Sequence, residues 1–234
     1  MRWQTVSRIL PAKLGRVLEI GCGKGAFAAR LARRSQDYVA LEPDPTSYTI
    51  ALGTAGDVAD VRQSRVEDLP QSEQFDLVCA FEVLEHLAND RAALARWVER
   101  LRPGGTLLIS TPAHSERLGA WDRMVGHYRR YDICQMHEML QTAGLESTAV
   151  ELYGFPAGPL LETARNFIAN RRMKRQEGDL GDYDHRTSSS GRLLQPGGAF
   201  SSAMMTAAGL PLAYLQRAFP DKGIALVALG KAPQ

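Results

Sequence analysis

The stretch that decides the fold is residues 17–25, which read VLEIGCGKG. It is a short apolar run that ends at three alternate glycines, and apolar side chains at helical spacing, Phe27 and Leu31, follow at once. Glycines between a strand and a helix let the backbone adopt a positive φ and approach a ligand closely. The stretch therefore predicts a strand, a turn and a helix. A ligand-binding role for the turn and a purely structural one are equally compatible with the glycines alone.

Further apolar runs alternate with stretches of helical spacing. The runs that predict strands are residues 38–41, 75–81, 106–110, 145–152 and 223–229. Alternation of this kind implies a parallel sheet with helices on both faces, an α/β fold. Ligands of such folds bind at the carboxyl ends of the strands. The sequence therefore predicts a site beside the glycine turn.

Two helices in this part of the chain have recognisable ends. Residues 89–90 (Asn-Asp) supply a cap for the first, whose apolar residues recur at helical spacing over 94–101. The sequence RPGG at 102–105 is expected to end it. The second begins at a capping-box pattern over 132–135 and ends at Gly144.

The composition is that of an ordinary soluble protein. The chain has 234 residues, 44% of them hydrophobic, and a net charge of +2. This balance argues against a dedicated nucleic-acid binder. Three widely spaced cysteines, Cys22, Cys79 and Cys134, argue against a disulfide framework and a structural zinc site. The sequence has neither a leader-like apolar region nor an apolar run long enough to span a membrane. We therefore expect a cytoplasmic protein.

Residues 154–222 differ in composition from the rest. They include helical spacing over 160–168, a basic run at 171–175, a Gly-, Asp- and Ser-rich stretch at 176–199 and a further helical pattern at 204–215. We predict a core of residues 1–153 and 223–234 with an insertion at 154–222 that covers, as a lid, the entrance to the site at the strand ends. The alternative is that the insertion only mediates dimer contacts. The basic run leaves peripheral membrane contact open.

An acidic residue follows the second predicted strand. Glu42 lies 21 residues beyond Gly21, where a carboxylate can accept hydrogen bonds from both hydroxyls of a ribose. The glycine pattern is neither a P-loop nor the dinucleotide GxGxxG. Glu19 beside it would repel a phosphate and suits a cationic group. These residues together favour a nucleoside that carries a charged amino-acid tail.

Five segments in this order resemble the motifs of class I S-adenosylmethionine-dependent methyltransferases. They are residues 17–25, Glu42, residues 66–70 (VEDLP), residues 75–87 and residues 101–107 (LRPGGTL). The resemblance covers residues 14–153 and the last predicted strand. It implies a Rossmann-like, seven-stranded sheet whose last strand, over 223–229, runs antiparallel, with a helical insertion before that strand.

The resemblance also implies which residues hold the cofactor, S-adenosylmethionine. They are Glu19, Gly21, Gly23, Gly25, Glu42, Val66, Glu67, Phe81, Glu82 and His86. The glycines would pass beneath the methionine part, Glu19 would lie near its ammonium group and Glu42 would hold the ribose. Many relatives have Asp where Arg65 stands, so Val66 or Glu67 must receive the adenine amino group here. For His86, support of its own loop is the alternative to ligand contact.

The acceptor side is predicted from two segments. His114 follows the fifth strand, and residues 126–132 (GHYRRYD) resemble a segment of a bacterial branch that includes ubiquinone- and menaquinone-type enzymes. His127 or His114 could remove a proton from an acceptor hydroxyl, because imidazole titrates near neutral pH. Tyr128, Arg129 and Arg130 are the candidate acceptor-binding residues, with the planar guanidinium groups suited to an anionic group. The alternative is that Tyr128, Arg129 and Tyr131 only pin the loop to the sheet.

The resemblance implies direct, in-line transfer of a methyl group to the oxygen or nitrogen of a small molecule. Residues 81–84 read FEVL, where base-methylating enzymes often carry an Asn/Asp-Pro-Pro-Tyr type motif. We therefore favour a small-molecule acceptor over RNA or protein, and expect no metal. The other alternative is a domain that binds the cofactor without catalysis. The oligomeric state is left open.

Overall fold

The computed structural model describes residues 1–175, 215–216 and 218–234. Its strands are β1 (Leu14–Ile20), β2 (Ser35–Leu41), β3 (Asp60–Arg62), β4 (Phe75–Phe81), β5 (Leu101–Pro112), β6 (Glu146–Gly154) and β7 (Gly223–Lys231). Its α-helices are α1 (Arg2–Ile9), α2 (Ala28–Leu31), α3 (Pro45–Ala55), α4 (Asp90–Val98), α5 (Ala120–Val125), α6 (Ile133–Thr142) and α7 (Ala157–Arg175).

The strands form one seven-stranded sheet in the order β3-β2-β1-β4-β5-β7-β6. The first five pair in parallel, whereas β7 runs antiparallel to both β5 and β6. The predicted α/β class, with an antiparallel last strand, is therefore confirmed. The chain reverses its direction of travel across the sheet between β1 and β4. At such a point the strand ends leave room for a ligand.

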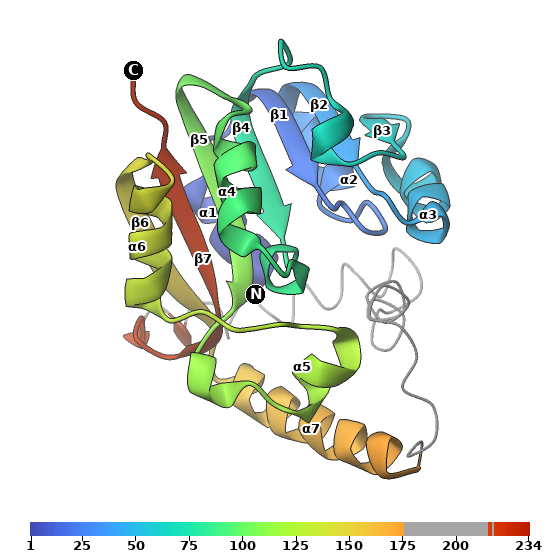
Figure 1. Ribbon diagram of the computed structural model, residues 1–234, viewed down its shortest axis with the longest axis vertical. Helices are drawn as coiled ribbons and strands as arrows, with labels where there is room; N and C mark the ends of the chain where they lie inside the picture. The colour runs from blue at the N-terminus through green and yellow to red at the C-terminus, as the bar shows by residue number, and fades with distance from the viewer. Residues whose placement is uncertain (176–214, 217) are drawn as a thin grey trace.

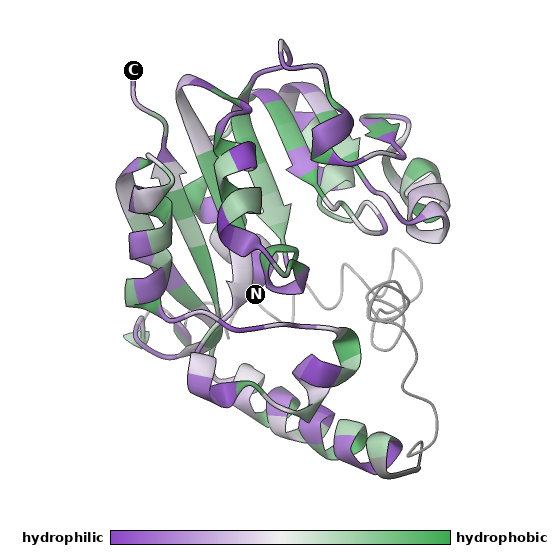
Figure 2. Cartoon of the chain, in the orientation of Figure 1, coloured by the Kyte–Doolittle hydropathy of each residue, from purple (hydrophilic) through white to green (hydrophobic). Residues whose placement is uncertain are grey.

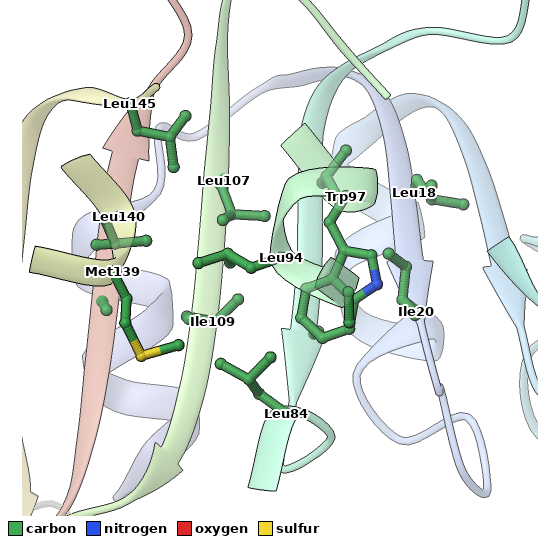
Figure 3. Close-up of a cluster of buried hydrophobic side chains, with 14 of the residues drawn as sticks. Leu18, Ile20, Leu84, Leu94, Trp97, Leu107, Ile109, Met139, Leu140 and Leu145 are labelled. Atoms are coloured by element: carbon green, nitrogen blue, oxygen red, sulfur yellow. The ribbon is translucent and has the colours of Figure 1, made fainter. Parts of the chain in front are cut away.

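Helices cover both faces of the sheet (Figure 1). On one face α4 and α6 pack Trp97, Leu94 and Leu140 against strand residues that include Leu18 and Ile109 (Figure 3). On the other face α1, α2 and α3 pack against the strands through a second apolar cluster. Strands buried on both faces read as nearly continuous apolar runs, which is why the sequence revealed them (Figure 2).

Two boundaries differ from the sequence predictions. The helix after the glycine turn is short, because α2 passes at Ala32 into a single 3₁₀ turn that ends at Arg34. The helix α4 ends at Val98, and residues 102–105 lie inside β5 instead of terminating that helix. Gly104 N donates to Pro233 O at 2.9 Å, and Gly105 O accepts from Ala232 N at 2.8 Å. This long-range pairing with the C-terminal segment extends the strand through the Pro-Gly-Gly sequence.

The predicted insertion is described only in part. The helix expected over 160–168 is present within α7, which lies beside α5 beyond the carboxyl ends of the parallel strands (Figure 1). The stretch 176–199, and all of 204–215 except its last residue, lie outside the described residues. The lid over the acceptor site therefore stays a prediction. Within the described part of the chain, no helix is both long and apolar enough to cross a membrane.

Candidate functional site

The glycine turn leaves β1 with its glycines in the left-handed region, at φ values of 67° for Gly21, 57° for Gly23 and 78° for Gly25. A Cβ on Gly25 would lie 3.2 Å from the Ala51 backbone, so this glycine is required by packing against α3. A Cβ on Gly23 would meet nothing within 4 Å. Gly23 therefore presents bare backbone to open space, as a turn that receives a ligand must.

Glu42 lies at the end of β2, next to this turn. Its carboxylate accepts hydrogen bonds from Gly23 N at 2.8 Å and Asp44 N at 2.9 Å, and only 8% of the residue is exposed. Burial raises its pKa, and the two backbone N–H groups oppose that shift. A carboxylate offers about four lone-pair sites, so capacity remains for two further donors such as ribose hydroxyls. Asp44 in turn caps α3 by accepting from Ser47 N.

Glu19 lies deeper, on β1, with its side chain almost fully buried. It accepts a hydrogen bond from the Tyr38 hydroxyl at 2.8 Å. Burial and the charge of nearby Glu42 raise the pKa of Glu19 to about 8. The hydrogen bond from Tyr38 opposes this shift. The predicted neighbour, an ammonium group, would favour the charged form of this carboxyl.

The raised pKa of Glu19 predicts a pH-dependent stability. Folding raises the pKa of Glu19 from the ordinary value of 4.5 to about 8. At a pH between these two values, the folded state keeps a proton that the unfolded state has lost. The contribution of Glu19 to stability therefore falls as the pH rises from about 4.5 to about 8. We expect Glu19→Gln to flatten the dependence of the melting temperature on pH over this window. Parallel curves for the two proteins would contradict this.

The remaining predicted cofactor residues surround the ends of β3 and β4. Val66 is buried, and Glu67 forms an ion pair with Arg96 at 3.4 Å. The Phe81 ring stacks on Phe27 with centroids 4.1 Å apart. Glu82 has a positive φ of 59°, and its Oε1 accepts from the Ser110 hydroxyl at 3.1 Å. These side chains make contacts within the protein at the strand ends where the sequence predicts the cofactor.

The N-terminal helix α1 adds residues to this region that the sequence analysis missed. The Arg2 guanidinium lies 3.2 Å from the Glu82 carboxylate and donates to the Tyr153 hydroxyl at 2.9 Å. The Trp3 ring meets Phe27 edge-on. Arg2 and Tyr153 are 151 positions apart, and neither belongs to a motif that could have signalled the contact.

A second group of polar side chains lies just beyond β4. Glu85 and His86 belong to the 3₁₀ turn Leu84–His86, and His127 follows α5. Tyr128 N donates to Glu85 O at 2.8 Å, which joins the two segments. The His86 and His127 rings meet edge-to-face at 4.6 Å, and His127 Nε2 lies 3.9 Å from Glu85 Oε1.

Several polar atoms of this second group have no hydrogen-bond partner among the described residues. Both carboxyl oxygens of Glu85, which is 0% exposed, and Nδ1 of His86 are buried without a hydrogen bond. Burial, reinforced by Glu82, raises the pKa of Glu85 well above its usual range. Burial and nearby His127 lower the pKa of His86 to about 4. Unsatisfied buried polar groups are costly, which suits a site that a polar ligand completes.

The donor atoms of Glu85, His86 and His127 lie within 4.8 Å of one another, a spacing also found around metal ions. We assign no ion to them, because the same arrangement suits a hydroxyl group. The prediction of no metal is open to a direct test. Activity lost in the presence of EDTA and restored by a divalent cation would overturn it.

The other predicted acceptor-side residues divide between exposed and internal positions. Tyr128 is exposed, and His114 Nε2 lies 3.0 Å from Gly223 O. Arg129 forms an ion pair with Asp90 at 2.7 Å. Arg130 is buried and donates to Asp122. Both arginines thus contact internal carboxylates, and a contact of either with the acceptor stays a prediction.

Comparisons with known proteins identify relatives of this chain. A family model described as a methyltransferase domain matches residues 4–150. The chain belongs to this methyltransferase family. The ubiquinone biosynthesis O-methyltransferase of Azorhizobium caulinodans is 38% identical over 105 residues, which cover 43% of this chain and 42% of that protein. The Xylella fastidiosa protein of the same name is 32% identical over 116 residues, 47% of each chain.

Solved structures of other proteins share the architecture of this family member at low identity. Phosphoethanolamine N-methyltransferase 2 of Haemonchus contortus, solved with S-adenosyl-L-methionine, matches with a TM-score of 0.60 and 18% identity over 99% of this chain and 52% of that one. The [4+2]-cyclase SpnF matches with a TM-score of 0.61 and 17% identity over 98% and 79% of the two chains. Because one fold carries such different reactions, function has to be inferred from the site.

Proposed function

We propose that this methyltransferase domain transfers a methyl group from S-adenosylmethionine to a hydroxyl oxygen of a small molecule. The observation that carries the proposal is the pairing of Gly23 with Glu42 at the strand ends where the sheet order reverses. Gly23 offers open backbone and Glu42 offers acceptor capacity, as a nucleoside requires. The relatives named O-methyltransferases favour oxygen as the methylated atom.

The residues present fit this cofactor. Glu42 would hold the ribose and Gly23 would lie along the methionine part. Glu19 would face the ammonium group from within the sheet. When bound, the cofactor supplies an activated methyl group on its sulfonium, so no covalent enzyme intermediate is required. The protein has to align donor and acceptor and exclude water.

On the acceptor side we propose His127 as the general base. Its Nδ1 lies 2.8 Å from Asp122 Oδ1, and its Nε2 faces the unpartnered Glu85 carboxyl group. A hydroxyl that enters there would donate to Nε2 and lie beside the Glu85 carboxyl group, whose pKa is raised by burial. Removal of the hydroxyl proton by His127 increases the nucleophilicity of the oxygen.

The proposal is tested by calorimetric titration with S-adenosylmethionine, followed by turnover assays. A panel of phenols and aliphatic alcohols would serve as acceptors, with S-adenosylhomocysteine release as the signal. We expect saturable binding of the cofactor and release that depends on a hydroxylated acceptor. If the cofactor binds but no turnover occurs on hydroxylated, amine, RNA or protein acceptors, the domain only binds the cofactor. Turnover on a macromolecule alone would contradict the small-molecule assignment.

We propose that the protein is located in the cytoplasm. Cys22, Cys79 and Cys134 are free thiols, which fits a reducing compartment.

A further inference from the structure

A buried carboxylate that the sequence analysis did not single out lies behind His127. Asp122, on α5, is 1% exposed, and its Oδ1 lies 2.8 Å from His127 Nδ1. The backbone of the same two residues is also joined, since His127 N donates to Asp122 O at 2.9 Å. We infer that Asp122 is a positioning residue that holds the His127 proton on Nδ1 and leaves Nε2 free to accept the proton of the acceptor. This inference rests on the proposed function.

The other oxygen of Asp122 is fully occupied by donors. Oδ2 accepts from Arg130 Nε at 3.0 Å, from Arg130 Nη2 at 2.7 Å and from Gly119 N at 2.8 Å. Burial by itself would raise the pKa of Asp122, but the hydrogen bonds from His127, Arg130 and Gly119 lower it to about 2. Asp122 is therefore ionised at neutral pH and can only accept hydrogen bonds. The Nδ1 atom that faces it must carry the proton.

The groups on the opposite side of the imidazole ring leave Nε2 available. The Glu85 carboxyl group, with its raised pKa, and the His86 ring are the titratable groups that face it. At 3.9 Å, Glu85 Oε1 is too far from Nε2 for a hydrogen bond. An acceptor hydroxyl of the proposed reaction would supply the missing partner.

A further ion pair connects this arrangement to α7. Glu162 of α7 is buried and pairs with Arg130, and Arg117 pairs with the same carboxylate. The chain of contacts thus runs from Glu162 through Arg130 and Asp122 to His127. The helix that begins the predicted insertion therefore helps to hold the proposed base in place. Removing Glu162 should loosen Arg130 but leave the direct Asp122–His127 hydrogen bond.

The tautomer of His127 tests the inference without any acceptor. Long-range ¹H–¹⁵N spectra of the full chain, recorded at a pH where imidazole is neutral, distinguish Nδ1–H from Nε2–H. The His127 signals are assigned by their absence from His127→Gln. We expect Nδ1–H in the wild type and in Glu162→Gln. Asp122→Asn should shift the proton toward Nε2, because a carboxamide can donate to Nδ1. The Nε2–H tautomer in the wild type would overturn the inference. So would the same tautomer in the wild type and in Asp122→Asn.

Kinetics supply a second readout. Asp122→Asn should lower kcat by roughly 10²–10⁴-fold, the range for a positioned proton acceptor, with unchanged affinity for S-adenosylmethionine. The matched control is Asp57→Asn, an exposed carboxylate 3.6 Å from Arg33, which should change neither kcat nor the tautomer. A loss of cofactor affinity equal to the loss of kcat would indicate a merely structural role. If His127→Gln retains full activity while the tautomers behave as expected, the base role fails and the positioning contact stands. If Asp122→Asn does not fold, the wild-type spectrum still decides.

Discussion

His127→Gln is expected to lower the turnover number by roughly 10²–10⁴-fold, the usual contribution of a positioned general base. Affinity for S-adenosylmethionine should be unchanged, because the His127 side chain lies against Asp122, Glu85 and His86, whereas the proposed ribose site is the Gly23–Glu42 pair. Steady-state rates on the responding hydroxylated acceptor, together with calorimetric titration of the cofactor, measure the two quantities separately.

The pH profile of the wild type sharpens this prediction. We expect the rate to rise with pH, because a general base must be free of its proton before it can accept one from the acceptor. The pKa of His86 is lowered to about 4 and that of Asp122 to about 2, so neither group accounts for a rise near neutral pH. Glu85, whose pKa is raised, is the competing group. Glu85→Gln should therefore keep the rise if His127 is the base.

The control for His127 is another histidine with an internal partner. His137 Nδ1 lies 3.0 Å from the Thr148 hydroxyl, between α6 and β6, and His137→Gln should leave turnover unchanged. A fully active His127→Gln enzyme would contradict the base assignment and make His114 the next residue to test.

The second large effect is expected in cofactor binding. Glu42→Ala should weaken binding of S-adenosylmethionine by roughly 1.5–3 kcal/mol, the range for hydrogen bonds to a charged group. This corresponds to a dissociation constant about 10- to 100-fold higher. Gly23→Val should be more severe, because its side chain would enter the open space over the turn and its φ of 57° is strained for a β-branched residue.

Variants at two other glycines distinguish an effect on cofactor affinity from an effect on stability. Gly53 on α3 also has open space around it but no positive φ, so Gly53→Val should keep cofactor affinity. Gly25→Val should lower the melting temperature, because its Cβ meets the Ala51 backbone at 3.2 Å. Gly23→Val with wild-type affinity would contradict the placement of the methionine part. Glu42→Ala with wild-type affinity would contradict the ribose assignment.

The sequence predicted best the features that depend on local chemistry. Strands β1, β2, β4 and β7 are buried on both faces, so their apolar runs were visible directly. Asn89, one of the two capping candidates, accepts from Ala92 N in α4, and Gly144 closes α6 with a φ of 86°. The position of Glu42 beside Gly23 also followed, because parallel neighbouring strands end at one edge of the sheet.

Where the sequence analysis was wrong, a long-range contact had overridden a local preference. The Pro-Gly-Gly sequence at 103–105 is a helix terminator by composition, yet hydrogen bonds to residues 232–233 make it part of β5. The contacts of Arg129 and Arg130 could not be predicted either, because no sequence pattern pairs these residues with a particular carboxylate. Only the folded chain shows that Asp90 and Asp122 engage their guanidinium groups.

The α/β architecture, the glycine turn and the acid that faces it could be predicted from the residues, because spacing along one strand, helix or turn is a local signal. Only the folded chain shows that Asp122 lies behind His127, that Glu162 of α7 reaches Arg130, and that Arg2 reaches Glu82. The Glu162–Arg130 and Arg2–Glu82 contacts join elements that are distant in the chain and have no periodic relation in sequence. Asp122 and His127 are close in sequence, and the turn that ends α5 brings their side chains together. The side chains of Asp122, Arg130 and Glu162 are buried, so removing one of them would leave another buried charge without its partner.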